Sequence, residues 1–186
     1  MRKNYGPKPY CYPMPALMIA TYNDDGTANA MLAAWGGISE QDEISITVAA
    51  THKTVANVLA RKAFTVSFAT EKYVIPCDYL GIVSGKKEPR KFEIAGFHAT
   101  KSEFVDAPII DELCMAIECN LISYDPESDR LVGRIVNVSA DESVLDEKEK
   151  VDPLLLSPVV YDPVNRGYYT LGTRVGSAFK DGTALK

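Results

Sequence analysis

The sequence predicts a mostly β fold, a β-barrel with few helices, formed by a single domain over residues 1–186. Short segments in which apolar and polar residues alternate recur along the chain, and this period of two is typical of strands with one buried face. Turn signals separate these segments, and only one segment early in the chain has clear helical spacing. Because strands dominate, we expect an antiparallel barrel rather than a doubly wound parallel sheet.

The chain begins with a proline- and tyrosine-rich stretch, residues 1–15, which we expect to form an extended arm. Residues 16–21 form a compact apolar strand that ends at a turn containing Asp25 and Gly26. Aspartate followed by glycine is a strong hairpin signal, because glycine adopts a positive φ without steric cost. The returning strand is expected over residues 27–34.

The next segments change period twice. Residues 43–49 alternate and predict a strand, whereas residues 51–62 have helical spacing, with Thr51 as the expected N-cap. Residues 64–69 alternate again. Residues 74–96 are irregular, and we expect no regular element there.

The second half of the chain predicts one long hairpin. Residues 115–123 share a face and lead through a turn at residues 125–129 into a partner strand over residues 130–139. The following residues, 141–150, form a charged stretch that we expect to be solvated. The domain therefore divides into the extended arm (1–15), the barrel (about 16–140) and a C-terminal extension (about 141–186).

Composition excludes several functional classes. Lys and Arg number 20 against 25 Asp and Glu, a net charge of −5, which argues against nucleic acid or anionic membranes as partners. The two histidines and four cysteines form no metal-ligand spacing, so we expect no metal and interpret the thiols as small buried hydrophobes of a cytoplasmic protein. No membrane-length apolar run, Walker loop or GxSxG motif is present.

Two local patterns are candidate binding sites. Residues 51–54, Thr-His-Lys-Thr, lie at a strand-to-helix junction, where unpaired backbone N–H groups, two hydroxyls and a lysine can cradle a phosphate. An N-cap followed by a surface lysine is the alternative interpretation. Residues 29–37 are small and apolar, so a flat ligand can approach their backbone beside Trp35. The alternative there is a buried tryptophan in a tight turn.

The order of these segments along the chain resembles the flavin reductase-like, FMN-binding split-barrel family, in particular its flavoredoxin branch. The resemblance spans roughly residues 16–182 and is carried by six colinear segments and a last one near the C-terminus: ALMIAT (16–21), NAMLAAWGGIS (29–39), ISITVAA (44–50), THKTVANVLARKAFTVSF (51–68), CDYLGIVSG (77–85), YYTLG (168–172) and VGSAFKDG (175–182).

The resemblance implies a six-stranded, Greek-key-like antiparallel FMN-binding split barrel. It also implies a homodimer with one FMN per subunit near the subunit interface. The chemistry would be carried by FMN, with no catalytic side chain. The residues that match the cofactor-binding positions are Thr51, His52, Lys53 and Thr54 for the phosphate, Asn29, Ala30, Met31, Ala33, Ala34 and Trp35 along the isoalloxazine ring, Lys91 as a further phosphate contact, and Tyr169 near the ring.

The chain departs from the wider family at two places. Residues 33–35 read Ala-Ala-Trp where a Ser/Thr-rich loop is usual, and residues 41–42 read Gln-Asp where a double proline is common. Both departures fit the flavoredoxin branch and argue against a free-flavin reductase that supplies a monooxygenase. We expect an FMN-binding oxidoreductase that passes electrons from NADH or NADPH, or from a protein donor, to an acceptor. The alternatives are an electron-transfer protein with redox-protein partners only, and a non-catalytic dimeric binding module.

Overall fold

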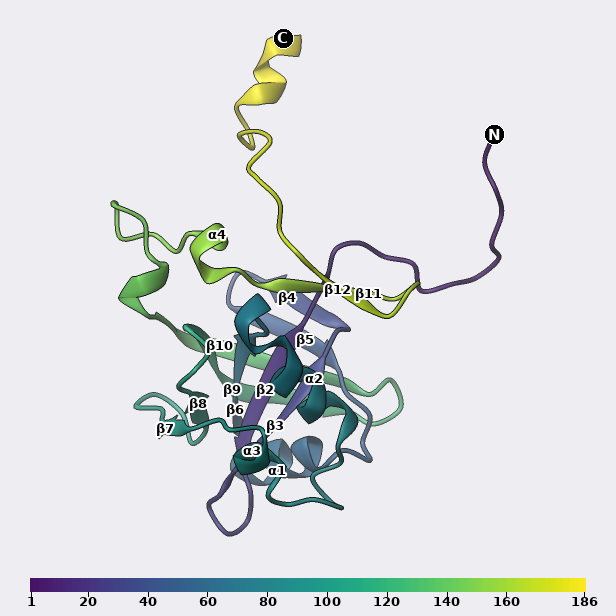
Figure 1. The fold of residues 1–186 in the computed structure, drawn as a ribbon. Helices are drawn as coiled ribbons and strands as arrows, with labels where there is room; N and C mark the ends of the chain where they lie inside the picture. The colour runs from purple at the N-terminus through teal and green to yellow at the C-terminus, as the bar shows by residue number, and fades with distance from the viewer.

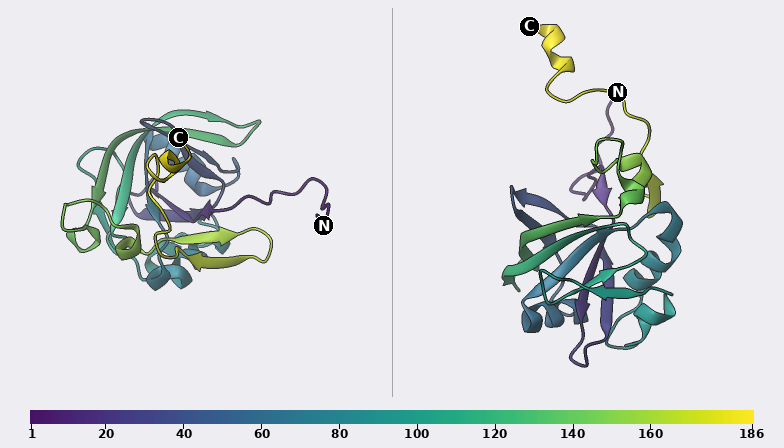
Figure 2. Two further views of the ribbon diagram at one scale, coloured as in Figure 1. Left: turned by 90° about the horizontal axis from the view of Figure 1, so that it is seen from above. Right: turned by 90° about the vertical axis from the view of Figure 1, so that its left-hand side faces the viewer.

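The structure, a computed structural model, describes residues 1–186 and is organised around one curled antiparallel sheet (Figure 1). Its strands hydrogen-bond in the order β3-β2-β6-β9-β10-β5-β4. The bounds are β2 (Leu17–Tyr22), β3 (Ala28–Ala33), β4 (Gly36–Glu40), β5 (Glu43–Thr47), β6 (Ala63–Phe68), β9 (Met115–Asp125) and β10 (Arg130–Ala140). Seen from above, the strands curl into a partial barrel around the core (Figure 2), so the prediction of a mostly β barrel is confirmed.

The main sheet has seven strands where six are expected. The additional strand is β4, which pairs with β5 through Gly36 and Ile46 and their neighbours. Two consecutive glycines start β4, and glycine is depleted in strands, so the sequence pattern indicated a turn there. The tight packing explains the glycine, because a Cβ on Gly36 would lie 3.0 Å from the Ile46 side chain.

A smaller sheet joins the two ends of the chain. Strand β1 (Met14–Pro15) pairs with β11 (Val159–Asp162), which pairs with β12 (Gly167–Thr170). The end of the arm therefore belongs to the fold, and the Tyr12 hydroxyl donates a hydrogen bond to the Asp162 carboxylate. The first residues and the tail beyond β12 extend away from the barrel (Figure 1). A separate hairpin consists of β7 (Ala99–Lys101) and β8 (Pro108–Ile110).

Helix α1 (Lys53–Arg61) starts later than its sequence pattern predicts. His52, in an extended conformation, precedes the helix, and no side chain caps it, so the prediction of Thr51 as N-cap was wrong. The His52 N–H donates to the carbonyl of Ala49 (3.0 Å), which closes a turn that occupies Thr51. The helix ends at Arg61, because Lys62 adopts a left-handed backbone with φ 60°.

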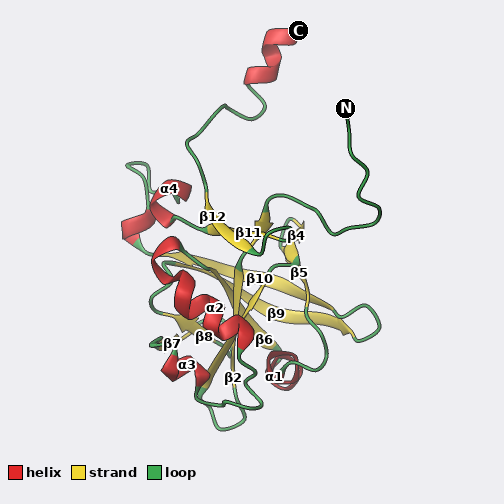
Figure 3. Ribbon diagram, turned by 45° about the vertical axis from the view of Figure 1, so that its right-hand side comes forward, coloured by secondary structure: helices red, strands yellow, loops and turns green.

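Residues 74–96, expected to be irregular, contain α2 (Val74–Ile82) and the short α3 (Lys91–Ile94), preceded by a 3₁₀ turn, η1 (Glu71–Tyr73). Figure 3 shows these helices on the outside of the sheet. Helix α2 packs against β3, so closely that a Cβ on Gly81 would lie 3.1 Å from the Leu32 Cβ. This close approach sets the position of the C-terminal end of α2 relative to β3.

Three further short helices occupy the C-terminal extension: η2 (Glu142–Val144), α4 (Pro153–Leu156) and η3 (Asp181–Leu185). The first lies within the charged stretch 141–150 that the sequence predicts to be solvated, and the other two follow it; most residues of the stretch are exposed. No helix is long and apolar enough to cross a membrane.

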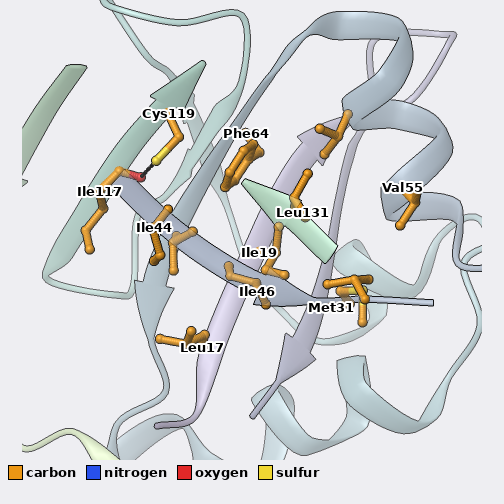
Figure 4. Packing of buried hydrophobic residues seen from close by; sticks show 13 residues of the cluster. Leu17, Ile19, Met31, Ile44, Ile46, Val55, Phe64, Ile117, Cys119 and Leu131 are labelled. Carbon is orange, nitrogen blue, oxygen red and sulfur yellow. Dashed lines mark hydrogen bonds between the residues drawn. The ribbon is translucent and has the colours of Figure 1, made fainter. Parts of the chain in front are cut away.

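The core has two parts, one on each face of β2. Leu17 and Ile19 point into the barrel, where they join a cluster of 13 buried residues (Figure 4). Met18 and Ala20 point outward into a second cluster that includes Leu80 of α2. Because successive side chains of a strand alternate between faces, a continuous apolar strand is what two buried faces require.

The thiols are less uniformly buried than expected. Cys77 and Cys119 are buried, Cys114 is intermediate, and Cys11 is exposed on the arm; all four are free. The prediction of buried hydrophobic thiols was therefore wrong for Cys11, because the arm before residue 12 makes little contact with the barrel.

Candidate functional site

Two adjoining cavities lie where β3, α1 and α2 meet. The larger, about 480 Å³, is lined mainly by apolar and aromatic side chains, and we call it the aromatic cavity. The smaller, about 270 Å³, is lined mainly by polar groups, and we call it the polar cavity. The two share Met31, His52, Gly81 and Ile82, so a single elongated ligand can occupy both. Taken together, their volume is in the usual range for small-molecule sites.

The polar cavity is built on the start of α1. Thr51, His52, Lys53 and Thr54 all line it. The first N–H groups of a helix lack intrahelical partners and carry partial positive charge, and here no side chain caps them. The Lys53 ammonium lies 3.0 Å from Asp24, whose side chain is 83% exposed. That exposed ion pair is weak, so the lysine can turn towards an anion at little cost.

Lys91 closes the opposite wall of the polar cavity. The residue is only 3% exposed, and its ammonium donates hydrogen bonds of 2.9 Å to the carbonyls of Leu80 and Val83. Burial lowers the pKa of Lys91 to about 8. An ammonium has three donors, so one remains for a ligand in the cavity.

A network of buried amides and hydroxyls supports the polar cavity from behind. The Asn29 amide donates to the Thr54 hydroxyl (3.0 Å), and the Asn57 amide donates to Thr21 (3.1 Å) and to Asn23 (2.9 Å). Asn29, Thr54 and Asn57 are each at most 3% exposed. Buried, connected hydrogen bonds of this kind fix side-chain orientation, so the cavity wall is preorganised.

The aromatic cavity lies between the β3–β4 connection and the β11–β12 hairpin. Trp35 and Tyr161 have ring centroids 6.4 Å apart, and Tyr161 and Tyr168 have centroids 6.0 Å apart. The Tyr168 hydroxyl donates to Asp78 at 2.7 Å, and burial together with this carboxylate raises the pKa of Tyr168. The tyrosine is therefore a neutral hydrogen-bonded wall rather than an acid.

His52 lines both cavities, and its imidazole is less basic than that of an ordinary histidine. Burial lowers the pKa of His52, and the nearby cations Lys91 and Lys86 lower it further. A neutral imidazole is therefore favoured at pH 7, and it can donate one hydrogen bond and accept another.

Ten of the twelve residues expected from the sequence line one of the two cavities, and the lining of each cavity is distinct. Asn29, Thr51, Lys53, Thr54 and Lys91 line the polar cavity, Ala33, Ala34 and Trp35 line the aromatic cavity, and Met31 and His52 line both.

The other two expected residues line neither cavity. Ala30 is fully buried in the outer core cluster, because the alternation of β3 turns its side chain away from its neighbours Asn29 and Met31. Tyr169 is 57% exposed, and its neighbour Tyr168 lines the aromatic cavity instead. The order of residues in β12 explains this difference, since consecutive strand residues face opposite sides.

Several lining residues were not predicted from the sequence, and the four that bring charged or aromatic side chains to the aromatic cavity are Asp78, Tyr161, Arg166 and Tyr168. Asp78 belongs to the α2 helix that the sequence pattern did not indicate. The other three lie on the β11–β12 hairpin, more than 100 residues after β3, and their place depends on the small sheet that joins the chain ends. The short apolar and aromatic segments on either side of the turn between Asp162 and Gly167 were the one local signal.

The arrangement suits a ligand with an anionic end and a flat apolar body. Helix N–H groups, two threonine hydroxyls and two lysines face the polar cavity, which is the donor set for a phosphate. Small residues and aromatic rings face the aromatic cavity, which accepts a planar heterocycle.

Comparison with known proteins identifies the family of the chain. The flavin reductase-like domain family matches residues 10–172, and the chain belongs to that family, in its flavoredoxin branch. The fold of the flavoredoxin of Desulfovibrio vulgaris (Miyazaki F) is similar, with 36% identity, a TM-score of 0.93 and coverage of 98% of this chain and 100% of that one. The flavoredoxin from Methanosarcina acetivorans has 25% identity and a TM-score of 0.89, with both chains fully covered.

A further relative is the uncharacterized protein YdfE of Bacillus subtilis (strain 168), which is 24% identical over 201 residues, 97% of this chain and 95% of that protein. The split-barrel fold expected from the sequence is thus confirmed, and the chain is a flavoprotein of an oxidoreductase family.

Proposed function

We propose that the protein is an FMN-dependent oxidoreductase that takes electrons from NADH or NADPH, or from a protein donor, and passes them to an acceptor. The observation that carries the proposal is the pair of connected cavities, one with the donor set of a phosphate site and the other with small and aromatic walls. Flavoredoxins of similar fold support the same cofactor class.

The residues of the polar cavity fit an FMN phosphate. Thr51, Thr54 and the first N–H groups of α1 would bond its oxygens, while Lys53 and Lys91 would balance its two negative charges. Riboflavin lacks this phosphate and would lose all of these contacts. The polar cavity therefore favours FMN over the unphosphorylated flavin.

The residues of the aromatic cavity fit the flavin ring. Met31, Ala33 and Ala34 offer small or flexible side chains beside exposed backbone, and Trp35 offers a ring face. Bound FMN supplies the redox chemistry, accepting and releasing one or two electrons. The chain binds and orients the cofactor, and no side chain has to act as a general acid.

The working form is proposed to be a homodimer in the cytoplasm. Val175, Phe179 and Leu185 on the tail are fully or almost fully exposed (100%, 103% and 94%), and large apolar side chains in this state favour a partner surface. Four free cysteines favour a reducing compartment.

A visible spectrum and a flavin titration test the cofactor. We expect flavin absorbance in the purified protein and FMN binding at least about tenfold tighter than riboflavin binding, since charged hydrogen bonds to the phosphate contribute about 1.5–3 kcal/mol each. A colourless protein that binds neither flavin would refute the proposal.

Anaerobic stopped-flow mixing with NADH and with NADPH tests the donor. Rapid bleaching of the flavin by one of them supports the oxidoreductase. Bleaching only by a reduced protein donor would instead favour the electron-transfer protein. Sedimentation over a concentration series, followed at protein and flavin wavelengths, tests the dimer, because a flavin-loaded 20.4 kDa species would contradict it.

A further inference from the structure

Arg166 is an unpaired cation in the wall of the aromatic cavity. The residue is exposed, and its guanidinium makes no hydrogen bond and no ion pair with any residue of the chain, unlike those of Arg61, Arg90 and Arg134, which all contact carboxylates. Asp78 is the one carboxylate in the same wall, and it accepts the Tyr168 hydroxyl instead. The cavity therefore presents a free guanidinium next to aromatic rings.

The hairpin turn fixes the backbone position of Arg166, whose side chain is exposed at the mouth of the cavity. Asp162, only 3% exposed, accepts the backbone N–H of Val164 (2.8 Å) and the side-chain amide of Asn165 (2.8 Å). It also accepts the hydroxyl of Tyr12 from the arm. These contacts engage both oxygens of the Asp162 carboxylate, which forms no ion pair with Arg166. The backbone of Arg166 has φ 56°, a left-handed conformation that this short, bonded turn imposes.

We infer that the aromatic cavity holds a second ligand beside the flavin, an aromatic carboxylate whose anion is bound by Arg166. The planar guanidinium matches the two oxygens of a carboxylate. Trp35, Tyr161 and Tyr168 pack on one another with ring centroids 6.0–6.4 Å apart and line this cavity, so they form an aromatic wall on which a planar ring can lie. This inference rests on the proposed function, because it takes the flavin as the neighbouring ligand.

The net charge of the chain is negative, so anion binding in the aromatic cavity would depend on the local charge of Arg166. The chain has a net charge of −5, so its long-range field does not attract anions. Phosphate groups already have a separate set of donors in the polar cavity. A single arginine among aromatic side chains instead selects small planar anions.

The test compares benzoate with benzamide, which has the same shape without the charge. FMN-loaded protein is titrated with each compound, and binding is followed by calorimetry and by changes in flavin absorbance. We expect benzoate to bind about 5- to 10-fold more tightly than benzamide, the value of one partly exposed charged hydrogen bond. Equal binding, or no binding of benzoate, overturns the inference.

Variants assign the effect to the guanidinium. Arg166→Gln should bring benzoate to the benzamide level, and Arg166→Lys should retain part of the preference. Lys101→Gln removes the same charge from β7, in the wall of a different cavity, and should leave both compounds unchanged. An equal loss in the Lys101 and Arg166 variants would show a general charge effect and overturn the inference.

Two controls separate this inference from the proposed function. All variants are checked for FMN affinity; if the wild-type protein retains no flavin, the proposed function fails, and calorimetry of the flavin-free protein with benzoate still tests Arg166. If Arg166→Gln weakens NADPH binding and leaves benzoate binding unchanged, the arginine serves the dinucleotide donor and the inference is wrong.

Discussion

The affinity for FMN should fall as pH rises from 7 to 9, because Lys91 loses its proton in this range. Burial lowers the pKa of Lys91 to about 8 in the flavin-free protein. A bound phosphate dianion stabilises the charged ammonium and holds the proton to higher pH. FMN binding above pH 8 therefore takes up a proton, and its dissociation constant increases with pH.

The magnitude follows from the protonated fraction. With a pKa of about 8, Lys91 is roughly nine-tenths protonated at pH 7 and roughly one-tenth protonated at pH 9. The dissociation constant of FMN should therefore rise about tenfold between these pH values. The phosphate itself stays a dianion throughout, since its second pKa is about 6.

Fluorescence titrations of FMN and riboflavin at pH 7, 8 and 9 measure the effect. Riboflavin has no phosphate, so its affinity should stay constant over this pH range. The riboflavin titration therefore serves as the control for any pH effect on the flavin ring. Lys91→Met should bind FMN more weakly and remove the pH dependence, whereas Lys53→Met should weaken FMN and keep it. An unchanged FMN affinity from pH 7 to 9, or an equal fall for riboflavin, would refute the reasoning.

The same lysine gives the flavin-free protein the opposite pH response. The unfolded chain holds the Lys91 proton up to a pKa of about 10.4, whereas the folded chain releases it near pH 8. The unfolded state binds more protons in this window, so the free energy of unfolding should rise with pH there. Urea midpoints without flavin measure this, and Lys91→Met should remove the rise.

Lys53→Ala should weaken FMN by about 10- to 150-fold and leave riboflavin unchanged, the loss of one charged hydrogen bond; equal losses for both flavins would mean a structural role. Gly133→Ala should lower the free energy of unfolding by about 1–3 kcal/mol in a urea titration, because the new Cβ would lie 2.3 Å from the ring of buried Phe64. An unchanged urea midpoint would contradict this. Burial raises the pKa of Cys77 to about 12, so a thiol reagent at pH 8 should label exposed Cys11 first and Cys77 only after unfolding; mass spectrometry of labelled native protein checks the order.

The parts of the fold that local chemistry determines could be predicted from the sequence. Gly26 adopts φ 83° at the predicted hairpin, and the alternating segments became β5, β6, β9 and β10. Helix α2 could not be predicted, because Pro76 and apolar residues around the whole helix hide its period. Proline is tolerated there since it lies in the first turn, where its missing N–H has no helical partner.

The candidate site divides in the same way. Four residues of the polar cavity, 51–54, are consecutive and lie at one junction, so their sequence pattern was visible, whereas the segment 80–85 on the opposite wall was not predicted to take part. The aromatic cavity draws Tyr161, Arg166 and Tyr168 from a distant hairpin, whose position depends on pairing with β1. Alternation alone also did not indicate which of two adjacent tyrosines, Tyr168 or Tyr169, faces inward.

The hydrogen-bonded wall formed by Asn29, Thr54 and Asn57 has a consequence for how the family diversifies. This wall supports the proposed phosphate end of the site with residues from the first third of the chain, whereas the hairpin from Val159 to Thr170 lines the aromatic cavity proposed for the flavin ring. If the flavin binds as proposed, we expect substitutions in that hairpin to change which molecule meets the flavin without releasing the flavin itself. Retention of the cofactor and choice of electron acceptor become separately mutable properties of one small barrel.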